Sequence, residues 1–449
     1  EACGLAPHVD MNPILLKPES NARSQVVVQG KVFATLDARD YFTRGQDSRL
    51  LRAVRESYER LAAQYEVIVI EGAGSAAEVN LRDRDLVNWT TVELADARVV
   101  LVGDIDRGGV FAQIVGTLDL IAAEERARVC GIVINKFRGD RTLFDEGVRF
   151  LTARTGIPIL GVLPYLRDLA LDQEDSLDVG ARAQIPFTAE RVNVAVLLLP
   201  HMSNFTDFNA LAQETDVALR YVATPEAALG ADVMILPGSK TTLSDLAYLR
   251  ERGFQSVLQD HVRRGGELVG VCGGYQMLGQ SIADPDGVET GGHDKGLELL
   301  PVTTVLARDK ITEQVEGQAL HIEGSTTLTV RGYLIHVGRT DRAGLRPCFQ
   351  LVRRKTSLDG STAIVRDEEC LDGAVRHDGL VWGTYVHGLF DQPDFRRAWL
   401  NRLRSRKGLP AVALEESHRV NDTRLNAMDR WADHVDRHLD LAPVLSWLR

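Results

Sequence analysis

The strongest constraint on the fold is a repeated alternation between short apolar runs and longer segments with helical spacing. In the first half, Val67–Ile70 and Val99–Val102 each lead into a polar turn. The strings VCGIVINKFRGD and GIPILGVLPYL repeat this pattern, and DSRLLRAVRESYERLAAQ has helical spacing. Strands that are apolar throughout and separated by helices are typical of a parallel sheet covered on both faces. Functional loops are then expected at the carboxyl ends of the strands.

The same alternation restarts in the second half with the strands VNVAVLLLP, ADVMILP and GELVGVC. The segment TLSDLAYLRERGFQSVLQDHVRRG predicts one helix, and the chain beyond residue 300 is richer in strand-like sequence. Between the halves, the region 170–190 is acidic and rich in small residues. We therefore predict an α/β domain over 1–180, a linker over 181–190 and a second α/β domain over 191–449.

Composition limits the classes of partner. The 449 residues are 44% hydrophobic and 26% charged, which is typical of a globular chain. The net charge of −11, without a basic block, argues against nucleic acid and anionic membranes as partners. No apolar run approaches the ~18 residues of a membrane span. The five scattered cysteines predict reduced thiols and a cytoplasmic location. The oligomeric state is not predicted.

A reactive cysteine is suggested by the string GELVGVCGGYQMLG. Gly270, Cys272 and Gly274 form the pattern G-x-C-x-G, the thiol counterpart of a nucleophile elbow between a strand and a helix. At the start of a helix, backbone N–H groups lower the pKa of a thiol. The alternative is a buried core cysteine, because free cysteine is often buried.

A nucleophilic thiol needs a base and a site for the developing oxyanion. His387, at the end of the β-like string GTYVHGLF, is the best candidate for the base. The loop Pro237–Gly238–Ser239 follows an apolar strand and could supply backbone N–H groups, although a plain turn is the alternative. Four other histidines compete with His387 or serve the structure: His201, His293, His321 and His336.

Together, the loop, the elbow and the distal histidine resemble class I glutamine amidotransferases. The resemblance implies a thiolate that attacks the amide of glutamine, and it adds Gly273 and Gln276 to the oxyanion and glutamine-binding groups. This chain departs from the family at Leu389, where those enzymes carry a glutamate two residues after the histidine. We therefore predict a Cys–His dyad.

The string EGAGSAAEVNLRDRDLVN carries the chemistry of the first half. Glu71 follows an apolar run and could hold Mg²⁺, while Gly72 and Gly74 would let phosphates approach the backbone. Asn135, in INKFRGD, could contact an adenine edge. Glycine-rich and Asn-Lys turns without a ligand are the alternatives.

Longer strings extend the resemblance over essentially the whole chain, and the family that they resemble is cobyric acid synthase. This implies a dethiobiotin-synthetase-like P-loop domain joined to a glutaminase. It also implies ATP- and glutamine-dependent amidation of the b, d, e and g carboxylates of adenosylcobyrinic acid a,c-diamide. The strings are MNPILLKP, SQVVVQGK, EGAGSAAEVNL, DIDRGGVFAQIVGTL, NKFRGD, LPGSKTT, GVCGGYQMLG, GYLIHVGRT and GTYVHGLF.

Contacts with the corrinoid are the least constrained expectation. Asp104, Asp106 and Arg107 lie in a predicted strand-end loop, where a structural salt bridge is an equal alternative. Lys17 and His336 are further candidates.

One part of the family pattern is missing. The chain starts at Glu1, and the string G-T-x-S-x-x-G-K-S that precedes MNPILLKP in the family does not occur. The expectation is an N-terminally truncated synthetase domain that binds ATP poorly, because loop N–H groups and a lysine hold the phosphates in such domains.

Three other functions stay open on the sequence alone. They are cobyrinic acid a,c-diamide synthase, another glutamine-dependent amide ligase such as the cell-wall amidation system, and a non-enzymatic corrinoid-binding module.

Overall fold

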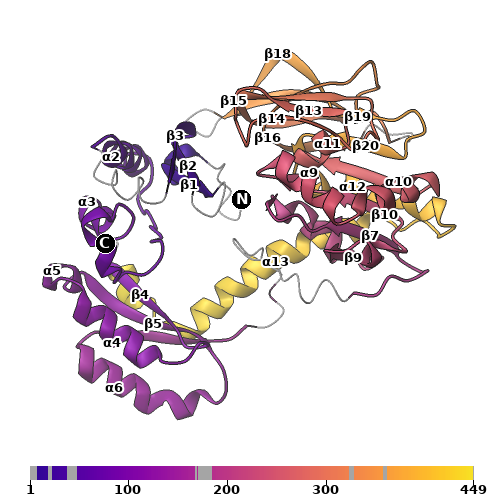
Figure 1. Ribbon diagram of the computed structural model, residues 1–449. Coiled ribbons are helices and arrows are strands. Elements are labelled where there is room, and N and C mark those ends of the chain that lie inside the picture. Colours follow the sequence, from indigo (N-terminus) through magenta and orange to yellow (C-terminus); the bar gives the residue numbers. More distant parts are fainter. Residues whose placement is uncertain are drawn as a thin grey trace. The chain divides into compact units, whose positions relative to one another are not determined.

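The computed structural model describes residues 8–18, 23–37, 48–166, 169, 185–322, 328–356 and 362–447. The chain forms two compact units, whose elements are labelled in Figure 1. Unit 1 comprises Glu1–Ala170 together with Asn426–Arg449, and unit 2 comprises Leu171–Leu425. Both units combine helices with parallel strands, as the alternation in the sequence predicts.

Unit 1 contains a parallel sheet of β4 (Val99–Asp104), β5 (Val129–Phe137) and β6 (Ile159–Pro164), in that order. Helices α4 (Val110–Leu120) and α6 (Asp145–Thr155) connect these strands. They pack on one face of the sheet, where α4 and β5 share a buried apolar cluster. The other elements are η1 (Val9–Met11), the antiparallel strands β1 (Ile14–Pro18), β2 (Arg23–Val28) and β3 (Lys31–Asp37), α2 (Ser48–Ala62), η2 (Val79–Arg84), α3 (Trp89–Leu94), α5 (Ala123–Arg126) and η3 (Arg141–Phe144).

One predicted strand of unit 1 is wrong. The run Val67–Ile70 has no strand structure, and the Val69 side chain is 92% exposed. A strand forms only where the backbone of a neighbour completes its hydrogen bonds. Within the described chain, β4 pairs with β5 alone, so the apolar run has no paired neighbour. An apolar run alone is therefore not enough to form a strand, because a neighbouring strand must also be present to pair with it.

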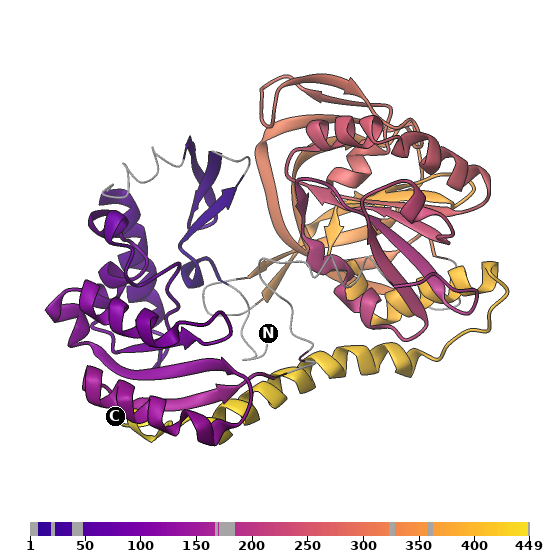
Figure 2. The same cartoon turned by 60° about the horizontal axis from the view of Figure 1, so that its bottom comes forward.

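The last part of the chain belongs to unit 1, not to the predicted domain 191–449. Helix α13 (Leu414–His438) and α14 (Ala442–Trp447) contain it. In α13 and the residues that follow, Trp431, Val435 and Leu439 pack on the second face of the unit 1 sheet. The backbone N–H of Asp440 donates to Leu160 at 2.7 Å, and Figure 2 shows this segment along the sheet. The helix covers an apolar sheet face that would otherwise meet water.

The predicted linker 181–190 is described only in part. Residues 181–184 lie outside the described residues. The next residues pack on unit 2, because Arg220 stacks its guanidinium 3.7 Å from the centre of the Phe187 ring and donates to the carbonyl of Ile185. Asn193 also pairs its side chain with both backbone groups of Thr188.

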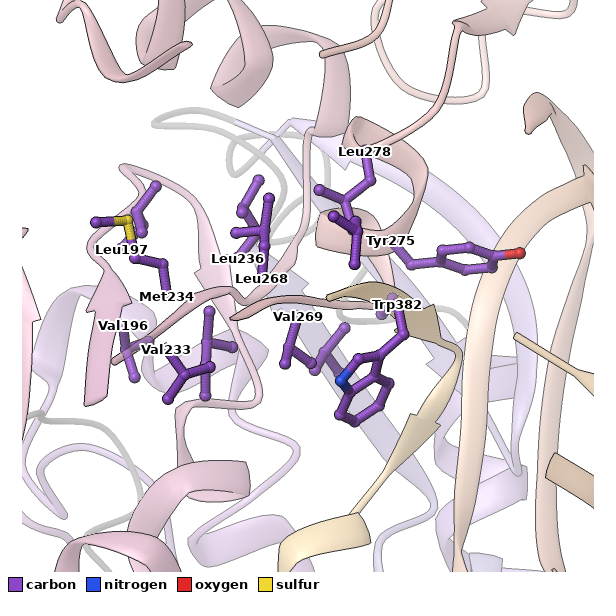
Figure 3. Packing of buried hydrophobic residues seen from close by; sticks show 14 of the residues in the cluster. Val196, Leu197, Val233, Met234, Leu236, Leu268, Val269, Tyr275, Leu278 and Trp382 are labelled. Carbon is purple, nitrogen blue, oxygen red and sulfur yellow. The ribbon is translucent and has the colours of Figure 1, made fainter. Parts of the chain in front are cut away.

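The main sheet of unit 2 has the order β19-β20-β12-β10-β7-β9. Successive residues of a strand point to opposite faces, so Val233 and Val269 lie on one face while Met234 and Leu268 lie on the other (Figure 3). Both faces are buried, which explains why these strands are apolar throughout. The strands are β7 (Val192–Leu197), β9 (Val217–Val222), β10 (Val233–Leu236), β12 (Glu267–Val271), β20 (Val381–Thr384) and the antiparallel β19 (Ala374–Val375).

The chain beyond residue 300 is β-rich, as predicted, and forms a second sheet in unit 2. Its strands are β13 (Ser281–Asp284), β14 (Gly292–Lys295), β15 (Thr303–Ala319), β16 (Thr329–Asp341), β17 (Phe349–Thr356), β18 (Thr362–Asp372) and β21 (Val386–His387). The other elements of unit 2 are β8 (Met202–Ser203), η4 (Phe205–Phe208), α8 (Asn209–Gln213), η5 (Glu226–Ala228), β11 (Gly238–Ser239), α11 (Gly273–Met277), η6 (Leu389–Asp391) and α12 (Pro393–Arg406).

The single helix predicted over TLSDLAYLRERGFQSVLQDHVRRG is two helices. They are α9 (Thr242–Glu251) and α10 (Phe254–Arg263). Gly253 between them has a φ of 78°, a left-handed conformation that ends a helix and that glycine adopts without steric cost.

The packing of α13 leads to a prediction. Trp431→Ala should lower the free energy of unfolding of unit 1 by about 2–3 kcal/mol, because it removes a partly buried aromatic side chain. Denaturant unfolding measures the change, with Asp436→Ala on the exposed side of α13 as the control. Equal effects of the two substitutions would contradict the packing described for this segment.

Candidate active site

The predicted turn between a strand and a helix is present at Cys272. This residue directly follows β12 and precedes α11, and its backbone has φ 52° and ψ −110°. A positive φ is strained for a residue with a Cβ atom, and such strain is typical of functional turns. The side chain is 7% exposed, and its Sγ donates to the carbonyl of Ile335 at 3.6 Å.

The glycines around the cysteine are required by close packing. A Cβ atom on Gly274 would lie 2.0 Å from the carbonyl oxygen of Leu236, at the end of β10. A Cβ on Gly270 would lie 2.7 Å from the carbonyl oxygen of Gly274, and one on Gly273 would lie 2.9 Å from the backbone nitrogen of Ser239. The glycine pattern therefore lets α11 pack directly on the strand ends and brings the elbow against the Ser239 loop.

His387 ends β21, which follows directly on β20, the neighbour of β12 in the sheet. Its Nδ1 lies 2.7 Å from Oδ2 of Asp207, and the backbone N–H of Gly388 donates to Oδ1 of the same carboxylate. Its Nε2 is buried and has no hydrogen-bond partner at standard distance. The ring stacks on Tyr333 with 5.3 Å between centroids.

The charge state of His387 reflects these neighbours. Burial by itself lowers the pKa of His387, but the Asp207 carboxylate and the Cys272 thiol together raise it to about 10. Because the Cys272 thiol contributes to this rise in the pKa of His387, the imidazolium form is favoured next to Cys272. Cys272, His387 and Asp207 thus form one connected group.

Asp207 is a candidate site residue that was not predicted from the sequence, and the predicted dyad omits it. The residue lies in η4, which follows β7, the strand next to β10, and it is 180 residues from His387 along the chain. Leu389, where the glutamate was absent, is buried in the core. The available signal was the acidic residue in HMSNFTDF, after a predicted strand, but only the strand order places it beside the histidine.

The loop after β10 lies against the elbow, as the sequence predicted. Gly238 and Ser239 pair with Ser203 and Met202 as a short antiparallel ladder. Ser239 Oγ donates to Asp245 at 2.6 Å, which fixes the loop to α9. Pro237 has no N–H, so only its neighbours can donate to an oxyanion.

Gln276 is nearly fully buried, and its amide is held at both ends. Its Nε2 donates to the hydroxyl of Tyr385 at 3.2 Å, and its Oε1 lies 3.1 Å from Oγ1 of Thr242. The side chain therefore links α9, α11 and the bend between β20 and β21, and it holds the first turn after Cys272.

The competing histidines have other surroundings. His336 stacks on Tyr385 at 3.7 Å, and burial lowers its pKa to about 4. His201 pairs with Asp245 at 2.9 Å, and His321 lies buried among aromatic side chains with a pKa that burial lowers to about 3. His336 lies in unit 2, beside the candidate active site.

In unit 1, the glycine turn after Glu71 is fixed by Asn88. The Asn88 side chain accepts from the N–H of Ala73 and donates to its carbonyl. Gly74 has a φ of 68°, and a Cβ on Gly72 would lie 2.3 Å from Asn88 Oδ1, so both positions require glycine. Glu71 is exposed.

The loops after β4 and β5 meet through salt bridges. Lys136 Nζ lies 2.8 Å from Asp104, and Arg138 Nε lies 2.6 Å from Asp106. The hydrogen bond from Lys136 is the largest cause of the lowered pKa of Asp104. The structure thus contains salt bridges at Asp104 and Asp106, which was the alternative interpretation of these residues. Arg107 is exposed beside them.

The remaining predicted residues are placed as follows. Asn135 pairs with Asp104 in the sheet register, and its Oδ1 accepts from the N–H of Lys136. Lys17 pairs with Gln25 in β1 and β2, and its side chain lies outside the described part.

A cavity of about 720 Å³ in unit 1 was not foreseen from the sequence. The turn at Ala73 and Gly74 lines it together with Trp89, and so do the segments around Arg82 and Leu120. Its volume lies in the usual range of small-molecule sites. Among the described residues, no group of three or more His, Cys, Asp or Glu side chains is arranged to bind a metal ion.

Comparisons with known proteins agree with this geometry. Residues 193–395 match the CobB/CobQ-like glutamine amidotransferase domain, and residues 23–173 match an AAA domain. The cobyric acid synthase of Syntrophobacter fumaroxidans is 45% identical over 99% of this chain and 86% of its own length. The chain belongs to the cobyric acid synthase family.

A second member of the cobyric acid synthase family, from Citrobacter koseri, is 47% identical over 99% of this chain and 85% of its own length. A structural comparison with PurLQS from Thermotoga maritima gives a TM-score of 0.33 at 16% identity, over 53% of this chain and 99% of that one. The family membership does not favour cobyrinic acid a,c-diamide synthase as the alternative.

The packing of the elbow leads to a second prediction. Gly274→Ala should lower the free energy of unfolding of unit 2 by about 1–3 kcal/mol, because the new Cβ would overlap the carbonyl oxygen of Leu236. Denaturant unfolding measures the change. Gly116→Ala in α4 is the control, because its Cβ would meet no atom within 4 Å and alanine favours a helix. An equal response of the two variants would contradict the close packing of α11.

The ion pair leads to a third prediction, on the dependence of stability on pH. Because Asp207 contributes to raising the pKa of His387 to about 10, the protonated ring stabilises the fold fully below about pH 6.5. This contribution is lost as the pH rises through 10. Asp207→Asn should remove most of it, so the stability advantage of the wild type should be larger at pH 6 than at pH 10. Denaturant unfolding at both pH values measures it, and parallel pH profiles would contradict the ion pair.

Proposed function

We propose that unit 2 hydrolyses glutamine with Cys272 as the nucleophile. The observation that carries the proposal is the connected group Cys272, His387 and Asp207 at neighbouring strand ends. A buried cysteine without a role would not need a strained turn or an imidazole with a free Nε2 beside it.

The chemistry follows from the positions of these groups. His387 holds the thiol proton on Nε2, and the Cys272 thiolate beside it attacks the side-chain amide carbon of glutamine. Backbone N–H groups of Gly238, Ser239 or Gly273 are proposed donors to the oxyanion. The proton returns from His387 to the departing nitrogen, and ammonia leaves a thioester on Cys272. Water then attacks the thioester with His387 as base, which releases glutamate and restores the thiol.

Asp207 orients the imidazole and stabilises its protonated form. Its two oxygens hold Nδ1 of His387 and the backbone N–H of Gly388, so the ring cannot turn away from the thiol. In this role it replaces the glutamate that is absent at Leu389.

The ammonia serves an amidation that belongs to the cobyric acid synthase family, to which the chain is 45–47% identical. We propose that the acceptors are the b, d, e and g carboxylates of adenosylcobyrinic acid a,c-diamide. The matched AAA domain supports nucleotide binding by unit 1. ATP would supply the activation that a carboxylate needs before ammonia can replace its oxygen.

The residues of unit 1 fit a phosphate-bearing ligand at the glycine turn. Gly72 and Gly74 keep this turn free of side chains, and Gly74 borders the large cavity. Glu71 is exposed beside it and is the proposed carboxylate for Mg²⁺. We further propose that Asn135 contacts the nucleotide. The residues proposed to contact the corrinoid are Lys17, Asp104, Asp106, Arg107 and His336. No helix among the described residues is long and apolar enough to cross a membrane.

A fourth prediction tests the nucleophile and the base. Cys272→Ala should abolish release of glutamate from glutamine, and His387→Ala should reduce it by about a hundred-fold or more, in line with the usual contribution of a general base. A glutamine-analogue electrophile should label Cys272 in the wild type, as located by peptide mass spectrometry.

The other free thiols of the described chain serve as controls for that labelling. Cys348 is fully buried, and burial raises its pKa well above the usual range, so it should stay unlabelled. Cys130 and Cys370 are partly buried and lie outside the elbow. Labelling spread evenly over these cysteines, or a Cys272→Ala protein that still hydrolyses glutamine, would refute the assignment.

A further inference from the structure

A partly buried carboxylate next to the elbow has no role in the chemistry proposed so far. Glu289 lies on the loop between β13 and β14. Asp284 fixes this loop by accepting from the backbone N–H groups of Val288, Glu289 and Gly291 at 2.7–2.9 Å. The loop thereby holds the Glu289 side chain against the first residue of α9.

The two oxygens of Glu289 have different partners. Oε2 accepts from the backbone N–H of Thr242 at 2.5 Å, and Oε1 lies 3.0 Å from the hydroxyl oxygen of Thr242. The same hydroxyl oxygen lies 3.1 Å from Oε1 of Gln276, on the helix that begins after Cys272. Thr242 and Gln276 are both almost fully buried.

At these distances, the oxygens of Thr242, Gln276 and Glu289 have one hydrogen too few to form both contacts as hydrogen bonds if Glu289 is ionised. The Thr242 hydroxyl has a single hydrogen, yet it faces two oxygens that can only accept if Glu289 is ionised. A buried oxygen that faces another oxygen without a proton between them is costly. A proton on Oε1 of Glu289 removes the conflict, because Glu289 then donates to Thr242 and Thr242 donates to Gln276.

The rest of the chain of hydrogen bonds agrees with this direction. The Gln276 amide nitrogen donates to the hydroxyl of Tyr385 at 3.2 Å, and this hydroxyl lies 2.6 Å from Oγ1 of Thr340. Thr340 continues to Thr304 at 2.7 Å. The hydroxyls of Thr242, Tyr385 and Thr340 then each accept once and donate once. The Tyr385 ring stacks on His336, and the electrostatic effect of Cys272 on Tyr385 places this chain near the nucleophile.

We propose that Glu289 is a positioning residue of the glutaminase, which carries a proton on Oε1 and through Thr242 fixes the orientation of the Gln276 amide beside the nucleophile. Loss of the proton would make Thr242 donate to Glu289. The Gln276 amide would then have to turn over, which reverses the hydrogen bonds at Tyr385. The inference rests on the proposed glutaminase function of unit 2.

The surroundings of Glu289 support a bound proton near neutral pH. Burial raises the pKa of Glu289 to about 7, although the hydrogen bonds from Thr242 and Leu243 act in the opposite direction. The Asp284 carboxylate adds to the rise from the same loop. The neighbouring groups on α9 and α11 are the neutral groups of Thr242, Leu243 and Gln276.

The test uses Glu289→Gln, whose amide nitrogen can donate to Thr242 as the protonated acid does. The variant should keep kcat/KM for glutamine hydrolysis within about three-fold at pH 6, because the number of hydrogen bonds is unchanged. The wild type should lose activity as the pH rises from 6 to 8, and the variant should lack this inflection. Glu251→Gln, an exposed change at the end of α9, is the matched control and should keep the wild-type pH profile.

A second measurement does not depend on activity. A carboxyl group with a raised pKa stabilises the fold fully below its unfolded pKa of about 4.5, and this contribution is lost as the pH rises through 7. The denaturant midpoint of the wild type, measured relative to Glu289→Gln, should therefore fall between pH 5 and pH 8. The Glu251→Gln midpoint should follow the wild type.

The possible results distinguish a failure of the inference about Glu289 from a failure of the proposed glutaminase function. An unchanged inflection in Glu289→Gln would overturn the inference, and so would a variant that is inactive at every pH while Glu289→Asp is active, because an ionised carboxylate would then be required. If the wild type hydrolyses no glutamine, the proposed function fails first. A flat unfolding difference would then also show that Glu289 holds no proton.

Discussion

The parallel pairing of β7, β10, β12 and β20 is the constraint on which the candidate active site depends. Parallel neighbours end at the same edge of a sheet, so the segments that follow these strands meet there. The loop at Gly238, the elbow at Cys272 and the histidine at position 387 come from three adjacent strands. Asp207 comes from the fourth, and its carboxylate completes the group.

Close packing at this edge sets the sequence requirements. Helix α11 lies so near the end of β10 that a side chain at position 274 would overlap a backbone carbonyl. The glycines therefore serve the geometry, and the cysteine between them takes the strained conformation that points its thiol toward the site. The same closeness brings Gln276 between Thr242 and Tyr385, so that a hydrogen-bond chain runs from the Glu289 loop to the neighbourhood of the nucleophile.

In unit 1, the cavity does not lie at the charged loops that follow the strands of the sheet. Its sheet has one face covered by α4 and α6 and the other by the end of α13. At the ends of β4 and β5, charged side chains form salt bridges with each other, Lys136 with Asp104 and Arg138 with Asp106. The large cavity lies instead along the glycine turn and the segment that ends near Trp89. The match to an AAA domain suggests nucleotide binding by this unit, and the glycine turn is the position that we propose for the nucleotide.

The sequence by itself determined the local features. Continuous apolar runs predicted β4, β5 and β6 of unit 1 and β7, β10 and β12 of unit 2, because a buried strand needs apolar residues on both faces. The pattern around Cys272 predicted the elbow, since only glycine tolerates such packing. Tertiary structure decided what depends on partners distant in the chain. Val67–Ile70 has strand composition but no paired neighbour in the described chain, and Trp431 joins unit 1 because an apolar sheet face needs cover. Asp207 reaches His387 only through the strand order, which no local pattern encodes.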